Sequence, residues 1–379
     1  MPAFPHELTR SDLERSIHGA LQLTGHPDGV APLRLPTWTR AQQADGGIER
    51  MSGQTSGVRL RLRTAAHTIR LEATFTRTVS AAHPARPFRL VAETASVACT
   101  VTLDEGTTLV ETRDGDATLQ PGPRSIVHFS LESAPGERVV TIWLPLAAAC
   151  VVHSVRADAP LTPCPAEAPR WLHYGSSISH GSDLHDPRGP WPQQVARELR
   201  LDLVNLGFAG NAMLDPFVAR AIADAPAHLI TLGIGINIVN GDAMRARTFA
   251  PAVHGFLDRV REGHPTVPLS IITAFACPIH EDSPGPTRAD RSGLAAATPR
   301  DLRPGDGSLT LARTRSLLEQ IVASRRDAML YLVDGLSLLG VDDGHLPDNL
   351  HPDQAGHDLI AARFAPHARR LLHSASVGR

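Results

Sequence analysis

The chain has 379 residues, of which 42% are hydrophobic, and a formal net charge of −2. This length exceeds what one ordinary core supports, so two domains are expected, and the composition excludes disordered and collagen-like chains. Acidic and basic residues balance without a basic stripe, which argues against a nucleic-acid partner. No apolar run reaches the roughly 20 residues of a membrane helix and no signal-peptide pattern opens the chain, so we expect a cytoplasmic protein with no membrane partner.

Residues 57–156 show short runs in which apolar and polar residues alternate, such as GVRLRLR, HTIRLEATF and RVVTIWLPL. Turn-forming stretches such as DEGT and APGE separate these runs at intervals of roughly ten residues. This pattern predicts an all-β sandwich, of jelly-roll-like type, and we place its domain at residues 1–157. Residues 1–56 show no clean periodicity and are assigned to this domain without a role.

The stretch DAPLTPCPAEAP, residues 158–169, is rich in Pro and Ala and predicts a linker. Over residues 170–379, continuous apolar runs alternate with helical patterns. The strand-like runs are RWLHY, LDLVNLGF, AHLITLGIG, PLSIITAFA and MLYLVDG, and the helical patterns lie near residues 190–200, 213–224, 247–263, 309–325 and 353–374. Such alternation predicts a doubly wound α/β domain with a parallel sheet, whose ligands bind at the carboxyl ends of the strands.

Small and polar residues follow three of these predicted strands, and a further pair lies near the end of the chain. Gly175 and two serines come directly after the first strand, Gly210 and Asn237 follow the next two, and Asp348 precedes His351 by three residues near the end of the chain. A serine nucleophile needs a base, a carboxylate that orients this base, and N–H donors for the oxyanion of the tetrahedral intermediate. These residue types therefore predict acyl transfer from one of the two serines.

The four blocks YGSSIS, NLGFAGN, LGIGIN and DNLHP resemble, in order, those of the GDSL or SGNH superfamily of esterases and acyltransferases. The resemblance spans residues 170–379 and implies the flavodoxin-like fold of that superfamily. It implies that Ser177 is the nucleophile, His351 the base and Asp348 the carboxylate that orients the base. The implied oxyanion hole consists of the backbone N–H of Ser177, the backbone N–H of Gly210 and the side-chain amide of Asn237.

Two positions depart from the family pattern, because the family usually has Asp where Ser176 and Ile238 stand. Neither position carries the proton transfer, so these departures bear on loop geometry or substrate preference. The G-x-S-x-G motif of ordinary α/β-hydrolases is not matched, since Ser179 occupies the place of its last glycine.

Simpler interpretations of the same residues stay open. Asn237 and Gly210 are also residues that build turns, and another carboxylate near His351 could orient the imidazole, namely Asp334, Asp342 or Asp343. We expect no metal site: the stretch SHGSDLHDP matches no zinc spacing and predicts a solvated loop. Its acidic and imidazole side chains are His180, Asp183, His185 and Asp186. For His357 we expect a packing role, and we expect the four scattered cysteines to be reduced.

A long segment rich in Pro, Gly and Ala, residues 277–307, follows the strand-like run PLSIITAFA. It predicts a structureless loop on the catalytic side, which either shapes the pocket or is a surface insertion.

We expect a serine esterase, such as a carbohydrate deacetylase, that needs no metal or organic cofactor. The alternative is an O-acyltransferase that uses acyl-CoA as a co-substrate and a hydroxyl group of a polyketide or sugar as the acceptor. The two-domain layout resembles that of carbohydrate esterases and also that of a salicylyl acyltransferase of tetracycline tailoring. A third hypothesis is a glycan-binding protein with a degenerate enzyme domain. In the first two cases the partners are a small-molecule ester or acyl donor and a hydroxyl-bearing acceptor.

Overall fold

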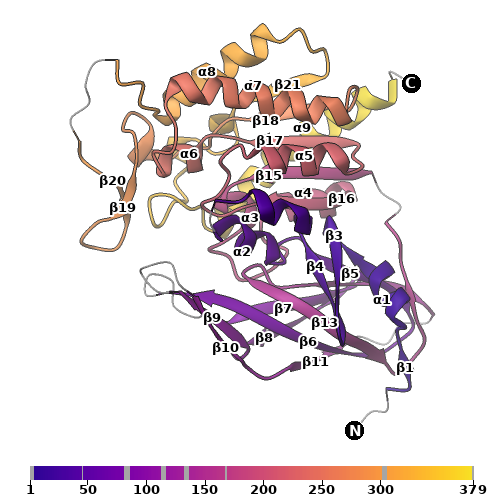
Figure 1. Cartoon of the computed structure of the whole chain (residues 1–379). Coiled ribbons are helices and arrows are strands. Elements are labelled where there is room, and N and C mark those ends of the chain that lie inside the picture. Colours follow the sequence, from indigo (N-terminus) through magenta and orange to yellow (C-terminus); the bar gives the residue numbers. More distant parts are fainter. Residues whose placement is uncertain are drawn as a thin grey trace. The chain divides into compact units, whose positions relative to one another are not determined.

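The computed structural model describes residues 4–44, 46–80, 86–111, 117–131, 136–166, 169–300 and 305–377. The chain divides into two compact units (Figure 1). One consists of Met1–Glu167 with His185–Arg188, and the other of Ala168–Leu184 with Gly189–Arg379. Among the described residues, no helix is both long enough and apolar enough to cross a membrane.

Two β-sheets form the amino-terminal unit. The eight-stranded sheet has the order β10-β9-β6-β13-β4-β3, with β1 beside β13 and β11 beside β6, and the six-stranded sheet has the order β14-β5-β12-β7-β8, with β2 beside β5. The strands are β1 (His6–Glu7), β2 (Ile17–His18), β3 (Gln22–His26), β4 (Gly29–Leu33), β5 (Arg59–Thr64), β6 (Thr68–Val79), β7 (Phe88–Glu93), β8 (Ala98–Leu103), β9 (Thr107–Glu111), β10 (Ala117–Gln120), β11 (Ser125–Ser130), β12 (Arg138–Trp143), β13 (Ala148–Ala157) and β14 (Leu161–Pro163).

The alternating sequence pattern produces the core of this unit. Every second residue of β6 is buried over most of the strand, including Leu71 and Phe75. These side chains join one hydrophobic cluster with Leu62 of β5 and Ile142 of β12, which belong to the other sheet. Inner faces that share one core make the unit a β-sandwich, as predicted.

Several elements of this unit were not predicted. The leading residues form β1 to β4 and two helices, α1 (Arg10–Ser16) and α2 (Gly47–Gly53). These elements are short and follow one another closely, so none of them produces a period in the sequence. Part of the predicted linker is also a strand, because β14 pairs with β5 in antiparallel register.

The second unit contains a five-stranded parallel sheet with the order β16-β15-β17-β18-β21. Its strands are β15 (Arg170–Gly175), β16 (Asp202–Gly207), β17 (Leu229–Gly233), β18 (Leu269–Ile272) and β21 (Leu330–Val333). The chain moves outward from β15 to β16 and then crosses to β17 on the other side of β15. The order of strands therefore reverses next to β15, which is where ligands bind in doubly wound sheets.

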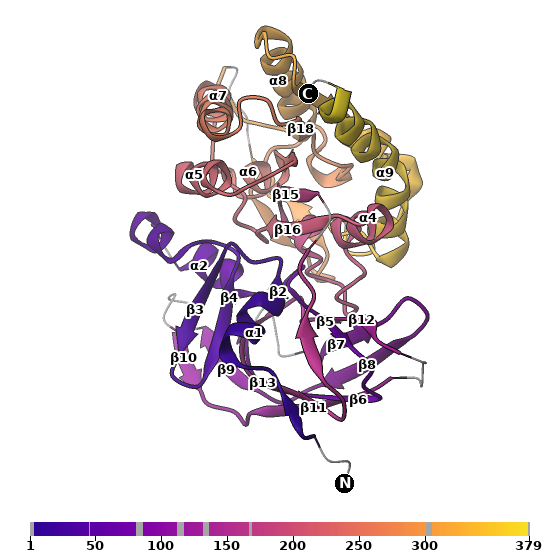
Figure 2. The ribbon, with the colours of Figure 1, turned by 90° about the vertical axis from the view of Figure 1, so that its right-hand side faces the viewer.

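Helices cover both faces of this sheet. Figure 2 shows α5 and α7 on one face and α4 and α9 on the other, and α8 packs against α7. The helices are α3 (Ser177–His180), α4 (Trp191–Leu199), α5 (Pro216–Asp224), α6 (Ile236–Asn240), α7 (Ala246–Gly263), α8 (Leu311–Ser324) and α9 (Gln354–Val377). All six residues of β16 are buried, as its continuous apolar run predicted, and the predicted α/β fold is confirmed.

The predicted structureless loop, residues 277–307, was wrong in part. It contains a short 3-10 turn (Pro278–His280) and a hairpin of two antiparallel strands, β19 (Thr287–Ala289) and β20 (Ala295–Ala297). These strands have three residues each, so no alternation of apolar and polar residues could show them. Residues 301–304 of the segment lie outside the described residues.

Candidate active site

A tight turn at the end of β15 holds the serine pair. A Cβ atom added to Gly175 would lie 2.3 Å from Oγ of Ser179, so a larger residue does not fit here. Ser176 caps α3, since its hydroxyl accepts a hydrogen bond from the backbone N–H of Ile178 at 3.3 Å. The turn thus starts α3 at Ser177, whose exposed fraction is 8%.

The loop before α9 brings an imidazole to this serine. Nε2 of His351 lies 2.9 Å from Oγ of Ser177, and Nδ1 of His351 donates to Oδ2 of Asp348 at 2.7 Å. With its proton on Nδ1, the ring presents the Nε2 lone pair to the hydroxyl. The structure therefore brings together a hydroxyl, a base and an orienting carboxylate from distant parts of the chain.

The pKa values of the two loop residues move in opposite directions. Burial opposes the ionised form of Asp348, but hydrogen bonds from the side chain and backbone of His351 outweigh it and lower the pKa of Asp348 to about 2. Burial also opposes the charged form of His351. The hydrogen bond to Asp348 and the negative charges of Asp183 and Asp348 outweigh this effect and raise the pKa of His351 above its ordinary value. The site is thus built to accept a proton on the imidazole.

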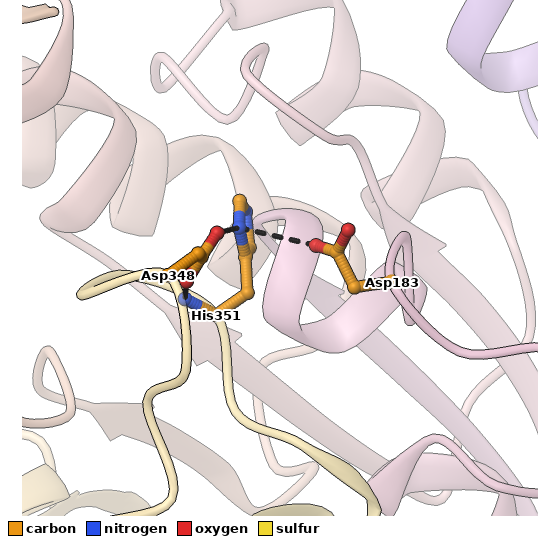
Figure 3. A group of neighbouring side chains, drawn as sticks. All are labelled: Asp183, Asp348 and His351. Atoms are coloured by element: carbon orange, nitrogen blue, oxygen red, sulfur yellow. Dashed lines mark hydrogen bonds and ion pairs between the residues drawn. The ribbon is translucent and has the colours of Figure 1, made fainter. Parts of the chain in front are cut away.

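Asp183 is a residue of this site that the sequence analysis missed. Its Oδ2 lies 3.1 Å from Nδ1 of His351, and Figure 3 shows Asp183 and Asp348 on either side of the ring. The side chain is 41% exposed, so the predicted solvated loop describes its surroundings only in part. One signal was available, namely that this carboxylate stands six residues after Ser177, the predicted nucleophile.

The other acidic and imidazole residues of SHGSDLHDP have different surroundings from those of Asp183. His180 is buried, and its Nδ1 donates to the carbonyl oxygen of Gly207 at 3.0 Å. His185 and Asp186 belong to the other unit. The ligand atoms of Asp183, Asp348 and His351 lie within 4.8 Å of one another, but Nδ1 of His351 already donates a hydrogen bond to Asp348.

Two of the alternative carboxylates have other partners. Oδ1 of Asp334 accepts from the backbone N–H of Leu336 at 3.1 Å, and Asp343 forms an ion pair with Arg363. His357 accepts from the backbone N–H of Trp191 at 3.2 Å, and burial lowers its pKa to about 4. This histidine packs in the fold, as expected.

Two of the three predicted oxyanion donors, Gly210 and Asn237, follow the strands that flank β15. Oδ1 of Asn237 accepts from the backbone N–H of Ala212 at 3.1 Å, which fixes the amide and leaves its Nδ2 without a partner among the residues that the structure describes. Gly210 has a φ of 69°, and a Cβ atom there would meet no atom within 4 Å. The backbone N–H groups of Ser177 and Gly210 also donate to none of the described residues.

The two departures from the family pattern have structural roles. Ser176 caps α3, as described above, and the side chain of Ile238 on α6 is fully buried. A carboxylate at position 238 would therefore be desolvated in the core. Both positions fit this chain as they stand.

A pocket opens beside the serine turn, at the carboxyl ends of three strands. Its walls come from the last residues of β17 and β18, from the residues after β15, β17 and β18, and from the start of α4, and most of them are small or apolar. The lining residues are Ser176, Ser179, Trp191, Gly233, Ile234, Ile236, Ile272, Thr273, Ala274 and Phe275.

Comparisons with known proteins agree with this geometry. The model of the GDSL-like lipase/acylhydrolase family matches residues 173–359, whereas no curated protein matches the sequence. The structure of the salicylyl-acyltransferase SsfX3 from a tetracycline biosynthetic pathway is similar over 95% of this chain and 94% of that chain, with 26% identity and a TM-score of 0.76.

Two esterases share the fold at lower identity. A family two carbohydrate esterase from Clostridium thermocellum, in complex with cellohexaose, is 13% identical over 94% of this chain and 99% of that chain, with a TM-score of 0.60. An acetyl xylan esterase from the rumen bacterium Butyrivibrio proteoclasticus is 10% identical over 98% of this chain and 99% of that chain, with a TM-score of 0.62. The resemblance found in the sequence is thus confirmed: residues 173–359 form a GDSL-like lipase/acylhydrolase domain, and the chain is an enzyme that acts on esters.

Proposed function

We propose that this enzyme transfers acyl groups through a covalent acyl-enzyme on Ser177. The observation that carries the proposal is the chain of hydrogen bonds from Ser177 Oγ to His351 Nε2, at 2.9 Å, and from His351 Nδ1 to Asp348, at 2.7 Å. These distances are those of a nucleophile, its base and the group that orients the base.

The reaction has two steps. Ser177 Oγ attacks the carbonyl carbon while its proton passes to His351 Nε2, and the oxyanion accepts hydrogen bonds from the N–H groups of Ser177 and Gly210 and from the Asn237 amide. His351 then returns this proton to the leaving group as the ester bond breaks. A second nucleophile attacks the acyl-enzyme, gives its proton to His351, and Ser177 is released with that proton. No step needs a metal or an organic cofactor.

Water is the acceptor in the function that we place first, which makes the protein an esterase. The base needs nothing beyond the described residues to activate water, because Nε2 of His351 remains beside the acyl-enzyme once the leaving group has departed. The substrate is then a small-molecule ester, such as an acetylated sugar. The absence of a cofactor and the cytoplasmic location stay predictions.

One observation favours a second candidate, an O-acyltransferase. SsfX3 is an acyltransferase, and its similarity extends over 95% of this chain at 26% identity. In this case a hydroxyl group of a polyketide or sugar takes the place of water, and acyl-CoA supplies the acyl group. A glycan-binding protein with a degenerate enzyme domain is the weaker hypothesis, since Ser177, His351 and Asp348 are intact.

A chromogenic acetyl ester tests the role of Ser177. We expect Ser177→Ala to remove turnover, whereas Ser316→Ala, which changes an exposed serine of α8, serves as the matched control and retains it. Equal turnover by the wild type and Ser177→Ala would overturn the proposal.

A separate assay distinguishes the two acceptors. The enzyme is incubated with an acyl-CoA, with and without a sugar or polyketide alcohol, and the products are identified by mass. Free acid as the main product in both mixtures supports the esterase. An acylated alcohol as the main product reverses the order of the two candidates.

A further inference from the structure

The imidazole of His351 has a carboxylate on each side of its Nδ1 atom. Asp348 Oδ2 lies at 2.7 Å and Asp183 Oδ2 at 3.1 Å from this nitrogen (Figure 3). The exposed fractions of the two carboxylate side chains are nearly equal, at 40% and 41%. Solvent therefore screens both interactions to a similar degree.

The position of Asp183 is set by the turn that carries the nucleophile. The carbonyl oxygen of Ser177 accepts from the backbone N–H of Gly181 at 2.8 Å and from that of Ser182 at 3.3 Å. The backbone N–H of Leu184 in turn donates to the carbonyl oxygen of Gly181 at 3.1 Å. Asp183 lies within this hydrogen-bonded turn, so its backbone is held close to Ser177, and from there its Oδ2 reaches Nδ1 of His351. Asp348, in contrast, comes from a loop far along the chain.

Nδ1 carries a single proton, and in the resting site it donates its hydrogen bond to Asp348, the nearer of the two carboxylates. When Ser177 passes its proton to Nε2, the ring becomes positively charged with a carboxylate on each side. Both negative charges then stabilise the imidazolium. We propose that Asp183 is a second positioning residue, which stabilises the charged form of His351 and accepts the hydrogen bond from Nδ1–H when Asp348 is absent. This inference rests on the proposed function.

A second histidine, His357, lies near the ring of His351 but carries no charge at pH 7. The charged groups that act on His351 are Asp183 and Asp348, and both raise its pKa. His357 lies close enough for its pKa to respond to His351, but burial keeps the pKa of His357 near 4, so it is neutral at pH 7. Removal of Asp183 therefore lowers the pKa of His351.

A double-mutant cycle tests this inference through the ester assay. The variants are Asp183→Asn, Asp348→Ala and the double variant, and Glu319→Gln, on the exposed face of α8, is the matched carboxylate control. We expect Asp183→Asn to lower kcat/KM only slightly in the wild type and about tenfold more in the Asp348→Ala background. This is the coupling expected of two residues that share a partner. An equal cost in both backgrounds would show that Asp183 does not replace Asp348.

The pH profile of kcat/KM distinguishes this electrostatic role of Asp183 from a purely structural one, which would not shift the profile. The acid limb of kcat/KM follows the deprotonation of His351, so it moves to lower pH in Asp183→Asn and stays in place in Glu319→Gln. The ¹⁵N shifts of the His351 ring in Ser177→Ala and Ser177→Ala/Asp183→Asn report the same pKa without any need for turnover. Superimposable titrations in these two variants contradict the inference. Should Ser177→Ala keep full activity, the proposed function itself fails, which is a different result.

Discussion

The carboxylate of Asp348 binds His351 twice, since Oδ1 accepts from the backbone N–H of His351 at 2.6 Å and Oδ2 accepts from its Nδ1 at 2.7 Å. Both contacts span three residues of one loop. The loop therefore fixes the backbone and the ring of the base with a single side chain. This arrangement explains how a short stretch of sequence orients Nε2 of His351 toward Ser177.

The raised pKa of His351 predicts the pH dependence of ester hydrolysis. Only the neutral imidazole accepts a proton from Ser177, so kcat/KM falls as the pH drops through the pKa of His351. Because that pKa is above its ordinary value of 6.5, we expect the midpoint of the acid limb above pH 6.5. Asp348→Ala removes the main group that raises it, so the midpoint moves to lower pH while the rate at every pH falls. A wild-type midpoint below pH 6 would contradict this account.

Divalent cations are not expected to support the reaction. The proton on Nδ1 of His351 occupies the position that a metal bound by Asp183 and Asp348 would need. Dialysis against EDTA should therefore leave kcat and KM unchanged. A loss of activity that added Zn²⁺ or Mg²⁺ restores would refute the prediction.

The amide of Asn237 is expected to act in the transition state. Loss of one oxyanion donor lowers kcat by about 10² to 10³, with little change in KM, because the ground state gains little from that donor. We expect this result for Asn237→Ala. Asn237→Asp keeps an acceptor for the backbone N–H of Ala212 but places a negative charge where the donor stood, so it should be equally impaired. Steady-state kinetics on the acetyl ester measure both, and an active Asn237→Asp would be inconsistent with the donor role.

Most of the second unit could be predicted because its strands are buried on both faces. The runs that form β15, β16 and β17 are mainly apolar, and each is followed by one of the residues proposed for the site, which places Ser177, Gly210 and Asn237 at one edge of the sheet. The short helices α3 and α6 were missed. They have four and five residues, which is too few for a helical period.

Asp183 could not be assigned because its contact depends on tertiary structure. The sequence shows a carboxylate in a polar stretch, and most such residues are solvated. Only the folded turn after Ser177 brings it within 3.1 Å of His351, which is distant in the sequence. The strands β14, β19 and β20 were missed for a related reason. Each has three residues, and its pairing with a neighbouring strand decides its conformation more than its own composition does.

Asn349 connects the loop of the base to the hairpin of β19 and β20. It has a φ of 69°, and its Nδ2 donates to the carbonyl oxygen of Ala295 at 3.2 Å, while the backbone N–H of Ala295 donates to the carbonyl oxygen of Asp348 at 3.0 Å. Both Asn349→Gly and Asn349→Ala lose the side-chain bond, and Asn349→Ala also holds alanine in the left-handed region, which asparagine and glycine tolerate better. We expect Asn349→Ala to lower the free energy of unfolding by about 1 kcal/mol more than Asn349→Gly does.

Urea denaturation of the two Asn349 variants measures this difference, and the ester assay reports whether the loop still holds His351. The activity should follow the same order as the stability. If Asn349→Ala is as stable as Asn349→Gly, the left-handed conformation of this residue carries no cost and the interpretation is wrong.

Two buried tryptophans of the second unit offer a matched test of one hydrogen bond. The side chains of Trp171 and Trp191 are both fully buried and lie in contact, with ring centroids 6.0 Å apart. Nε1 of Trp171 donates to Oγ1 of Thr231 at 2.8 Å, whereas Nε1 of Trp191 is buried without a hydrogen-bond partner in the part of the chain that the structure describes.

A change of either tryptophan to phenylalanine removes a similar apolar volume, so the loss of packing nearly cancels between the two variants. Trp171→Phe also breaks a hydrogen bond, while Trp191→Phe removes an N–H group that has none. The free energy of unfolding, measured by urea denaturation, should therefore be lower in Trp171→Phe by about 1 kcal/mol. Equal stabilities, or a less stable Trp191→Phe, would mean that the indole N–H of Trp191 has a partner such as bound water, because an N–H group without one contributes nothing that the substitution can remove.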